Sequence, residues 1–150
     1  MERTIGLDTN VLARYFVSPK PTDAAECRQA ALAIALIDSG QPLAVCKTVL
    51  LELEWVLRGY YGYPAKAIRA AFDYLLSQPH INVEDRPQVE NALRNIAAGL
   101  DFADALHHAS YATCARVASF DDRGFARRSD KLKLQPPVKV PLARKAAAKK

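Results

Sequence analysis

Cysteines are few in this chain, and none of them forms a metal-binding or redox pair in the sequence. Cys27, Cys46 and Cys114 are an odd number at wide spacing, and no Cys-x-x-Cys pair is present. Neither a disulfide framework nor a cysteine-based zinc site is therefore indicated. We expect all three to be buried or half-buried packing residues.

Long apolar runs are also missing. The longest helix-like stretches are interrupted by charges well short of the roughly 20 apolar residues that a membrane span needs. The N-terminal residues Met1–Ile5 run directly into a strand-like segment and have no apolar signal core. We expect no membrane association and a cytoplasmic location.

Positive charge is concentrated near the C-terminus. Residues 1–122 have 11 Lys and Arg against 15 Asp and Glu, a net charge of −4, whereas residues 123–150 have 10 against one, a net charge of +9. A basic segment of this kind attracts polyanions such as RNA. The length and the ordinary composition suit one domain, which we place at residues 1–142, followed by a basic, disordered tail at residues 143–150.

Short apolar segments alternate with helical patterns along the chain. The predicted strands are Thr4–Leu7, Leu43–Cys46, His80–Val83 and Val117–Phe120, with an edge strand near Val138–Val140. The predicted helices are Asn10–Val17, a helix that Thr22 or Asp23 caps and that ends near Ser39, Lys47–Gly59, Ala65–Ser77, Pro87–Ala98 and Phe102–Cys114. This alternation is typical of an α/β fold with a short, mostly parallel sheet.

Two aspartates, Asp8 and Asp121, each come directly after a predicted strand. Because the carboxyl ends of parallel strands share one edge of a sheet, where ligands bind, we expect both side chains at that edge. An Asp in this position also commonly caps the following helix. For each residue taken alone, both roles stay open. Asp101 and Asp104 add a D-x-x-D helix start, in which Asp101 would be the cap and Asp104 would lie in the first turn.

The predicted helix Lys47–Gly59 adds Glu52 and Glu54. Both fall at similar angles on either side of an apolar stripe, so periodicity does not choose between them. The stripe consists of Val49, Leu50, Leu53, Val56, Leu57 and Tyr60. Leu51 and Trp55 fall on the far side and suggest a second buried face, such as a dimer interface.

Gathered carboxylates repel one another unless a cation or protons compensate them. Mg²⁺ and Mn²⁺ prefer oxygen ligands, and one or two such ions can activate a water and stabilise the charge that builds on a phosphodiester. A carboxylate cluster beside a basic segment therefore indicates hydrolysis of a nucleic-acid backbone.

Four segments in order resemble the PIN domain, and most closely the VapC-type toxins of bacterial toxin–antitoxin pairs. They are Asp8-Thr9-Asn10-Val11-Leu12, Leu51-Glu52-Leu53 with Trp55-Val56-Leu57, Phe102-Ala103-Asp104-Ala105-Leu106, and Ser119-Phe120-Asp121 with Phe125. The resemblance spans residues 4 to about 128.

The resemblance implies a three-layer α/β/α sandwich and cleavage of RNA by a Mg²⁺- or Mn²⁺-dependent endoribonuclease. It implies that Asp8, Glu52, Asp104 and Asp121 hold one or two metal ions, and so favours Glu52 over Glu54. Asn10 and Ser119 match supporting polar positions. Hydrolysis would leave a 5′-phosphate and a 3′-hydroxyl. The resemblance also implies a homodimer held inactive by a small antitoxin protein.

Several other residues near the acids are candidates with less support. Arg14, Arg123, Arg127 and Arg128 are candidate phosphate contacts because of their charge and their nearness to the acids. Asp122 could share the role of Asp121. His107 and His108 follow Asp104 on the same predicted helix, but surface or packing roles are commoner for such histidines.

Four alternatives are weighed against a metal-dependent toxin ribonuclease. A phosphatase of the haloacid dehalogenase type needs a second Asp two residues after the first, and Asn10 stands there. A non-catalytic RNA-binding PIN-like domain usually lacks one or more of the acids, and a housekeeping ribonuclease would have no antitoxin. A DNA or flap nuclease usually needs a longer chain. The identity of the RNA does not follow from the sequence.

Overall fold

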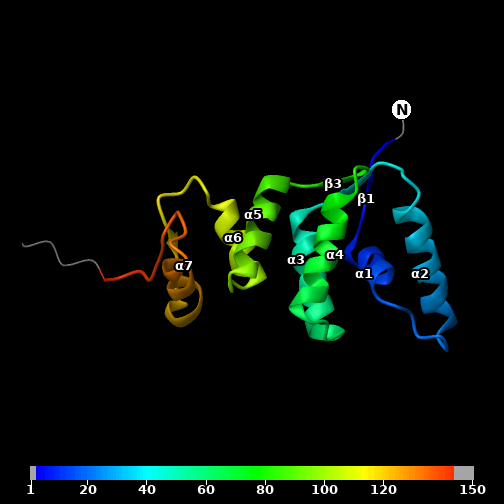
Figure 1. Cartoon of the computed structure of the whole chain (residues 1–150), viewed down its shortest axis with the longest axis horizontal. Coiled ribbons are helices and arrows are strands. Elements are labelled where there is room, and N and C mark those ends of the chain that lie inside the picture. The colour runs from blue at the N-terminus through cyan, green and yellow to red at the C-terminus, as the bar shows by residue number, and fades with distance from the viewer. Residues whose placement is uncertain (1–2, 144–150) are drawn as a thin grey trace, which may run out of the picture. The chain divides into compact units, whose positions relative to one another are not determined.

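The computed structural model describes residues 3–143 and divides into two compact units, Met1–Val89 and Glu90–Lys150. We call them the first and the second unit and describe each by itself (Figure 1). Among the described residues, no helix has both the length and the apolar character needed to cross a bilayer.

The first unit contains a parallel sheet of three short strands in the order β1-β2-β3. They are β1 (Ile5–Gly6), β2 (Leu43–Val45) and β3 (Ile81–Val83). Leu43 pairs with Ile5 on one side and with Ile81 on the other. Since all three strands run in the same direction, their carboxyl ends lie at one edge, where Asp8 follows β1.

Helical segments connect these strands. They are α1 (Thr9–Phe16), α2 (Ala24–Ile37), α3 (Lys47–Trp55), the π-helical segment η1 (Val56–Tyr60) and α4 (Ala65–Ser77). Asp23 caps α2, as the sequence predicts, because its Oδ1 accepts a hydrogen bond from the Glu26 N–H at 3.0 Å. Helix α1 packs against both α2 and α3 (Figure 1). The core between the helices and the sheet is formed by large, fully buried side chains, among them Leu12, Ile37, Leu43, Leu53, Leu57 and Phe72.

The second unit contains a smaller parallel pair of strands with helices around it. Its elements are the rest of α5 (Arg86–Ala97), which begins in the first unit, α6 (Phe102–Ser110), β4 (Val117–Ala118), the π-helical segment η2 (Asp122–Ala126), α7 (Arg127–Lys131) and β5 (Val138–Lys139). Val117 pairs with Val138. Phe102, Leu106, Phe125 and Val138 are buried in its core.

The α/β class with short parallel strands is confirmed, and α4 has the predicted bounds. Helix α6 is shorter than predicted, since it ends at Ser110 rather than Cys114. There the Ser110 hydroxyl donates to the Leu106 carbonyl at 3.0 Å, and the Tyr111 N–H is shared between the carbonyls of His107 and His108. The sequence did not predict η2 and α7, because residues 122–131 lack a helical apolar period.

The predicted burial of the cysteines is correct only for Cys27, which is half-buried. Cys46 and Cys114 are exposed, and all three are free thiols. Cys46 lies at the N-cap of α3, outside the sheet core, where its Sγ contacts the Thr48 hydroxyl at 3.2 Å. The predicted tail, apart from Ala143, lies outside the described residues.

Candidate active site

Asp8 stands between β1 and α1 in the first unit. The preceding Leu7 N–H donates to the Ala44 carbonyl at 2.9 Å, so the chain is bound to β2 up to the residue before the acid. Asp8 Oδ1 accepts a hydrogen bond from the Thr9 N–H at 2.8 Å, and the side chain is exposed. Asp8 therefore caps α1 and also presents a carboxylate at the end of the strand, so the two roles that the sequence left open are compatible.

The two glutamates of α3 have different environments. Glu54 is only 8 % exposed and forms an ion pair with Arg58, whose Nε lies 2.8 Å from Glu54 Oε1. Glu52 is exposed and has no hydrogen bond or ion pair with any residue in the range 3–143. Glu54 thus has a structural partner one helical turn away, while the carboxylate of Glu52 is available to a ligand.

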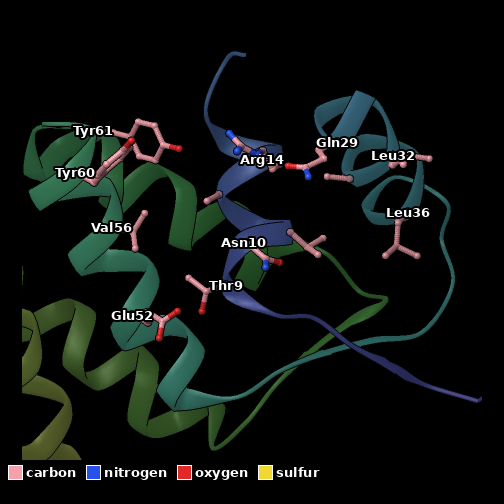
Figure 2. Close-up of a pocket in the computed structure, with 13 residues that line it drawn as sticks. Thr9, Asn10, Arg14, Gln29, Leu32, Leu36, Glu52, Val56, Tyr60 and Tyr61 are labelled. Atoms are coloured by element: carbon pink, nitrogen blue, oxygen red, sulfur yellow. Dashed lines mark hydrogen bonds between the residues drawn. The ribbon is translucent and has the colours of Figure 1, made fainter. Parts of the chain in front are cut away.

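Glu52 lines a pocket of about 720 Å³ in the first unit (Figure 2). Its walls come from α1, α2 and the continuous rod of α3 and η1. The polar lining residues are Thr9, Asn10, Arg14, Gln29 and Glu52, and the others are apolar or aromatic: Val11, Ala13, Leu32, Ala33, Leu36, Val56, Tyr60 and Tyr61. Sequence reasoning did not single out Gln29 or the tyrosines as site residues, although the dense run Tyr60-Tyr61-Gly62-Tyr63 was a visible signal.

Arg14 is held in place on the pocket wall. Its Nη1 lies 2.7 Å from Glu26 Oε1, and its Nε donates to Gln29 Oε1 at 2.9 Å. Hydrogen bonding by the Lys20 N–H and by Arg14 holds the pKa of Glu26 below its usual value. The positive charge of Arg14 is therefore already paired with a carboxylate inside the protein.

In the second unit, Asp104 lies half-buried in the first turn of α6. Burial raises the pKa of Asp104, and the nearby carboxylates of Asp101 and Asp121 raise it further, while His107 and Arg128 oppose the rise. Asp101 occupies the N-cap position, as predicted, but its side chain makes no capping hydrogen bond. Asp101 therefore contributes negative charge rather than a helix cap.

Asp121 is fixed by backbone amides at the start of η2. Its Oδ1 accepts from the Gly124 N–H at 2.9 Å, and its Oδ2 accepts from the Phe125 N–H at 3.1 Å. Its own N–H donates to Ser119 Oγ at 3.1 Å, so Ser119 contacts the backbone of Asp121. A Cβ on Gly124 would lie 2.4 Å from Asp121 Oδ2, so only glycine fits under this carboxylate.

The remaining candidates of the second unit lie on its surface, with one exception. Arg123, Arg127 and Arg128 are exposed on η2 and α7, and Arg127 Nη2 is 4.0 Å from the exposed carboxylate of Asp122. His107 is exposed. His108 is buried, and its Nε2 is 2.8 Å from the Pro136 carbonyl, so this ring joins α6 to the segment before β5.

The donor chemistry suits a hard divalent cation. Carboxylate oxygens are the ligands that Mg²⁺ and Mn²⁺ prefer, and the pKa of Asp104 is raised by burial and, to a smaller extent, by the carboxylates of Asp101 and Asp121. Among residues 3–143, no group of three or more His, Cys, Asp or Glu side chains lies close enough together to hold an ion. Asp8 and Glu52 belong to the first unit, and Asp104 and Asp121 to the second.

The family model of the PIN domain matches residues 5–131, and the chain therefore belongs to the PIN domain family. The short parallel sheet and the surrounding helices agree with the α/β/α fold of that family. PIN domains are in general nucleases, and they generally use divalent metal ions. No curated protein matches the chain.

Replacing Gly124 by alanine should displace the carboxylate of Asp121. The added Cβ would clash with both carboxylate oxygens and with Cγ, so the two amide hydrogen bonds must break or lengthen. We expect a loss of about 1–3 kcal/mol in the free energy of unfolding, measured by denaturant titration, and a clear loss of nuclease activity. Gly59→Ala is the control, because a Cβ there meets the Trp55 ring at an ordinary 3.8 Å. An active and fully stable Gly124→Ala protein would contradict this account of Asp121.

Replacing Asp104 by asparagine should stabilise the metal-free protein. The pKa of Asp104 is higher in the folded than in the unfolded protein. Ionisation of Asp104 therefore lowers the free energy of unfolding as the pH rises above the unfolded-state pKa, and this loss is complete above the folded-state pKa. At neutral pH in EDTA, we expect Asp104→Asn to melt a few degrees above the wild type, and the difference should vanish at a pH below the ordinary pKa. Thermal unfolding followed by circular dichroism checks this, and an unchanged or lower Tm of Asp104→Asn at neutral pH would contradict the raised pKa of Asp104.

Proposed function

We propose that this protein is a metal-dependent endoribonuclease. The observation that supports this most directly is the place of Asp104, a half-buried carboxylate near those of Asp101 and Asp121; burial first, and then these two charges, raise its pKa. A divalent cation relieves the repulsion between such carboxylates. Membership of a family whose members are in general nucleases supports the same conclusion.

Asp8, Glu52, Asp104 and Asp121 are the proposed ligands of one or two Mg²⁺ or Mn²⁺ ions. A bound ion supplies an activated water and offsets the charge that builds on the scissile phosphate. The backbone amides that bind Asp8 and Asp121 fix these carboxylates before any ligand arrives. In-line attack on the phosphate would leave a 5′-phosphate and a 3′-hydroxyl.

Two polar residues support these acids in the proposed site. Asn10 follows Asp8 by two positions, lines the same pocket as Glu52 and leaves its amide unbonded within residues 3–143. Ser119 orients Asp121 through the backbone. Both therefore act on the position of ligands rather than on the reacting phosphate.

Substrate binding would depend on exposed basic residues. Arg123, Arg127 and Arg128 follow Asp121 within a few residues and are exposed, which suits contacts to the phosphates on either side of the cut. Arg14 is a weaker candidate for a phosphate contact, since Glu26 already pairs with it. The basic end of the chain would add affinity without sequence preference.

We further propose that the protein is the toxin of a toxin–antitoxin pair. The motif order that resembles VapC-type toxins supports this, and the exposed Trp55 side chain on α3, with the half-buried Leu51 one turn before it, is compatible with the homodimer that such toxins form. In that setting the protein would act on RNA in the cytoplasm and would be held inactive by a small antitoxin protein. Growth arrest on expression of the wild type, but not of Asp8→Asn, is the cellular outcome expected.

The nuclease is tested by incubating purified protein and RNA with Mg²⁺ or Mn²⁺, beside an EDTA control. Cleavage should require metal and should fall by several orders of magnitude in Glu52→Gln if the acids act as a unit. Glu54→Gln is the matched control from the same helix. It breaks the ion pair with the half-exposed Arg58 but keeps the size and polarity of the side chain, so its cleavage rate should stay close to that of the wild type.

Two outcomes would overturn parts of this assignment. RNA binding without cleavage in any metal would favour a non-catalytic RNA-binding PIN domain. Loss of activity in Glu54→Gln with full activity in Glu52→Gln would reverse the choice between the two glutamates. Asp8→Asn adds a third check, because asparagine caps a helix as well as aspartate does and should leave stability unchanged while activity is lost.

A further inference from the structure

We propose that the pocket of the first unit binds one unstacked base of the RNA close to the cut, with Tyr60 as the stacking platform. The proposal rests on the ribonuclease function proposed above and assigns a base-binding subsite to that activity. Three observations support the proposal: the exposed Tyr60 ring packs against Tyr61, side-chain amides lie on the opposite wall, and Glu52 lines the same pocket.

Tyr60 is exposed where the helical pattern predicts a core position. The sequence places it on the apolar stripe of α3, yet its side chain is 77 % exposed. The cause is the π-helical segment η1, whose turn is wider than that of an α-helix and rotates position 60 away from the stripe. The Tyr61 N–H donates to the Val56 carbonyl at 3.1 Å, and the Tyr63 N–H donates to the Leu57 carbonyl at 2.8 Å, which fixes this turn.

The neighbouring Tyr61 packs against the Tyr60 ring. Tyr61 meets it edge-on, with ring centroids 4.8 Å apart and planes at 82°, and Tyr63 supports Tyr61 in turn at 6.4 Å. A tyrosine held in this way loses little conformational entropy when a flat ligand stacks on its free face. Exposed aromatic rings stack on unpaired bases in proteins that bind single-stranded nucleic acid.

The opposite wall favours a base over a phosphate. The Arg14 guanidinium, the one cationic group among the lining residues, is already paired with Glu26 at 2.7 Å. Gln29 Oε1 accepts from Arg14, so its carbonyl is fixed and its NH₂ group is left as a donor toward the pocket (Figure 2). Asn10 adds a second amide. Amides can pair with the donor and acceptor edges of a base, whereas Glu52 would repel an additional phosphate.

The geometry also sets where the base lies in the substrate. Glu52, Val56 and Tyr60 follow one another along the same rod and line the same pocket (Figure 2). Eight residues at about 1.5 Å per residue separate Glu52 and Tyr60 by about 12 Å. At a stacked spacing of about 3.4 Å per nucleotide, the bound base lies within about four nucleotides of the phosphate that is cut.

The test deletes the ring and the base separately and together. A short RNA with a mapped cut is prepared with each of the nearest nucleotides replaced in turn by an abasic ribose, and KM and kcat are measured for wild type and Tyr60→Ala. We expect one abasic position to raise the wild-type KM about 5- to 150-fold, the range for loss of one stacked base. Tyr60→Ala should show the same loss on intact RNA, no further loss at that position, and an unchanged kcat.

Two variants control for folding and for general loss of aromatic surface. Tyr60→Phe keeps the ring and should behave as the wild type. Tyr111→Ala removes another aromatic side chain, which is 48 % exposed and does not line the pocket, and should leave KM unchanged. Circular dichroism should show the same melting curve for Tyr60→Ala and wild type, because the deleted ring is largely in solvent.

Failure of this inference is distinct from failure of the nuclease assignment. If the wild type cleaves and the losses from Tyr60→Ala and the abasic position multiply, the ring does not stack on that base and the subsite is wrong. It is equally wrong if Tyr60→Ala changes the oligomeric state while KM stays the same, since the surface is then a protein interface. If the wild type does not cleave any RNA, the nuclease assignment fails, and fluorescence anisotropy with a short RNA that the protein binds, with each nucleotide made abasic in turn, still decides whether Tyr60 binds a base.

Discussion

Burial of Asp104 near two other carboxylates is the constraint on which the proposed active site depends. Burial together with the charges of Asp101 and Asp121 raises the pKa of Asp104, so the folded chain keeps acids together at a cost in stability. Hydrogen bonds from backbone amides to the carboxylates offset part of this cost in stability. Asp121 receives two amide hydrogen bonds, for which Gly124 must lack a side chain, and Asp8 receives one from Thr9. The acids are thus oriented by the ends of strands and the starts of helices, which is why capping and metal binding can be served by the same side chains.

The first unit links chemistry and recognition through one rigid element. The rod formed by α3 and η1 presents Glu52 at one end of a pocket and Tyr60 at the other, while Glu54 on the opposite side pairs with Arg58. A helix is well suited to hold a metal-binding residue and a base-binding residue, because its residues keep fixed distances from one another. The π-helical turn breaks the regular helical period and thereby brings a tyrosine into the pocket wall. π-helical turns occur often at functional sites for this reason.

The sequence alone was sufficient for those features that depend on local pattern. Alternating strands and helices predicted the α/β class, and the place of Asp8 directly after a strand made it a candidate both for a helix cap and for a ligand site, of which the structure shows the cap. Features that depend on tertiary contacts could not be derived. Periodicity was symmetric between Glu52 and Glu54; the family resemblance favoured Glu52, and in the structure burial and the ion pair with Arg58 set Glu54 apart. The exposure of Tyr60 follows from a π-helical turn that no residue type announces, and η2 forms around the Asp121 carboxylate without an apolar period.

The central claim is that Asp104 and its neighbours bind a divalent cation. Calorimetric titration of the metal-free protein with Mn²⁺ tests it most directly, with Asp104→Asn compared with Asp23→Asn, a helix-cap aspartate on α2 outside the proposed site. The account predicts that the wild type and Asp23→Asn bind Mn²⁺ alike, and that Asp104→Asn binds at least about 10- to 100-fold more weakly. Equal affinity of Asp104→Asn and the wild type would contradict it.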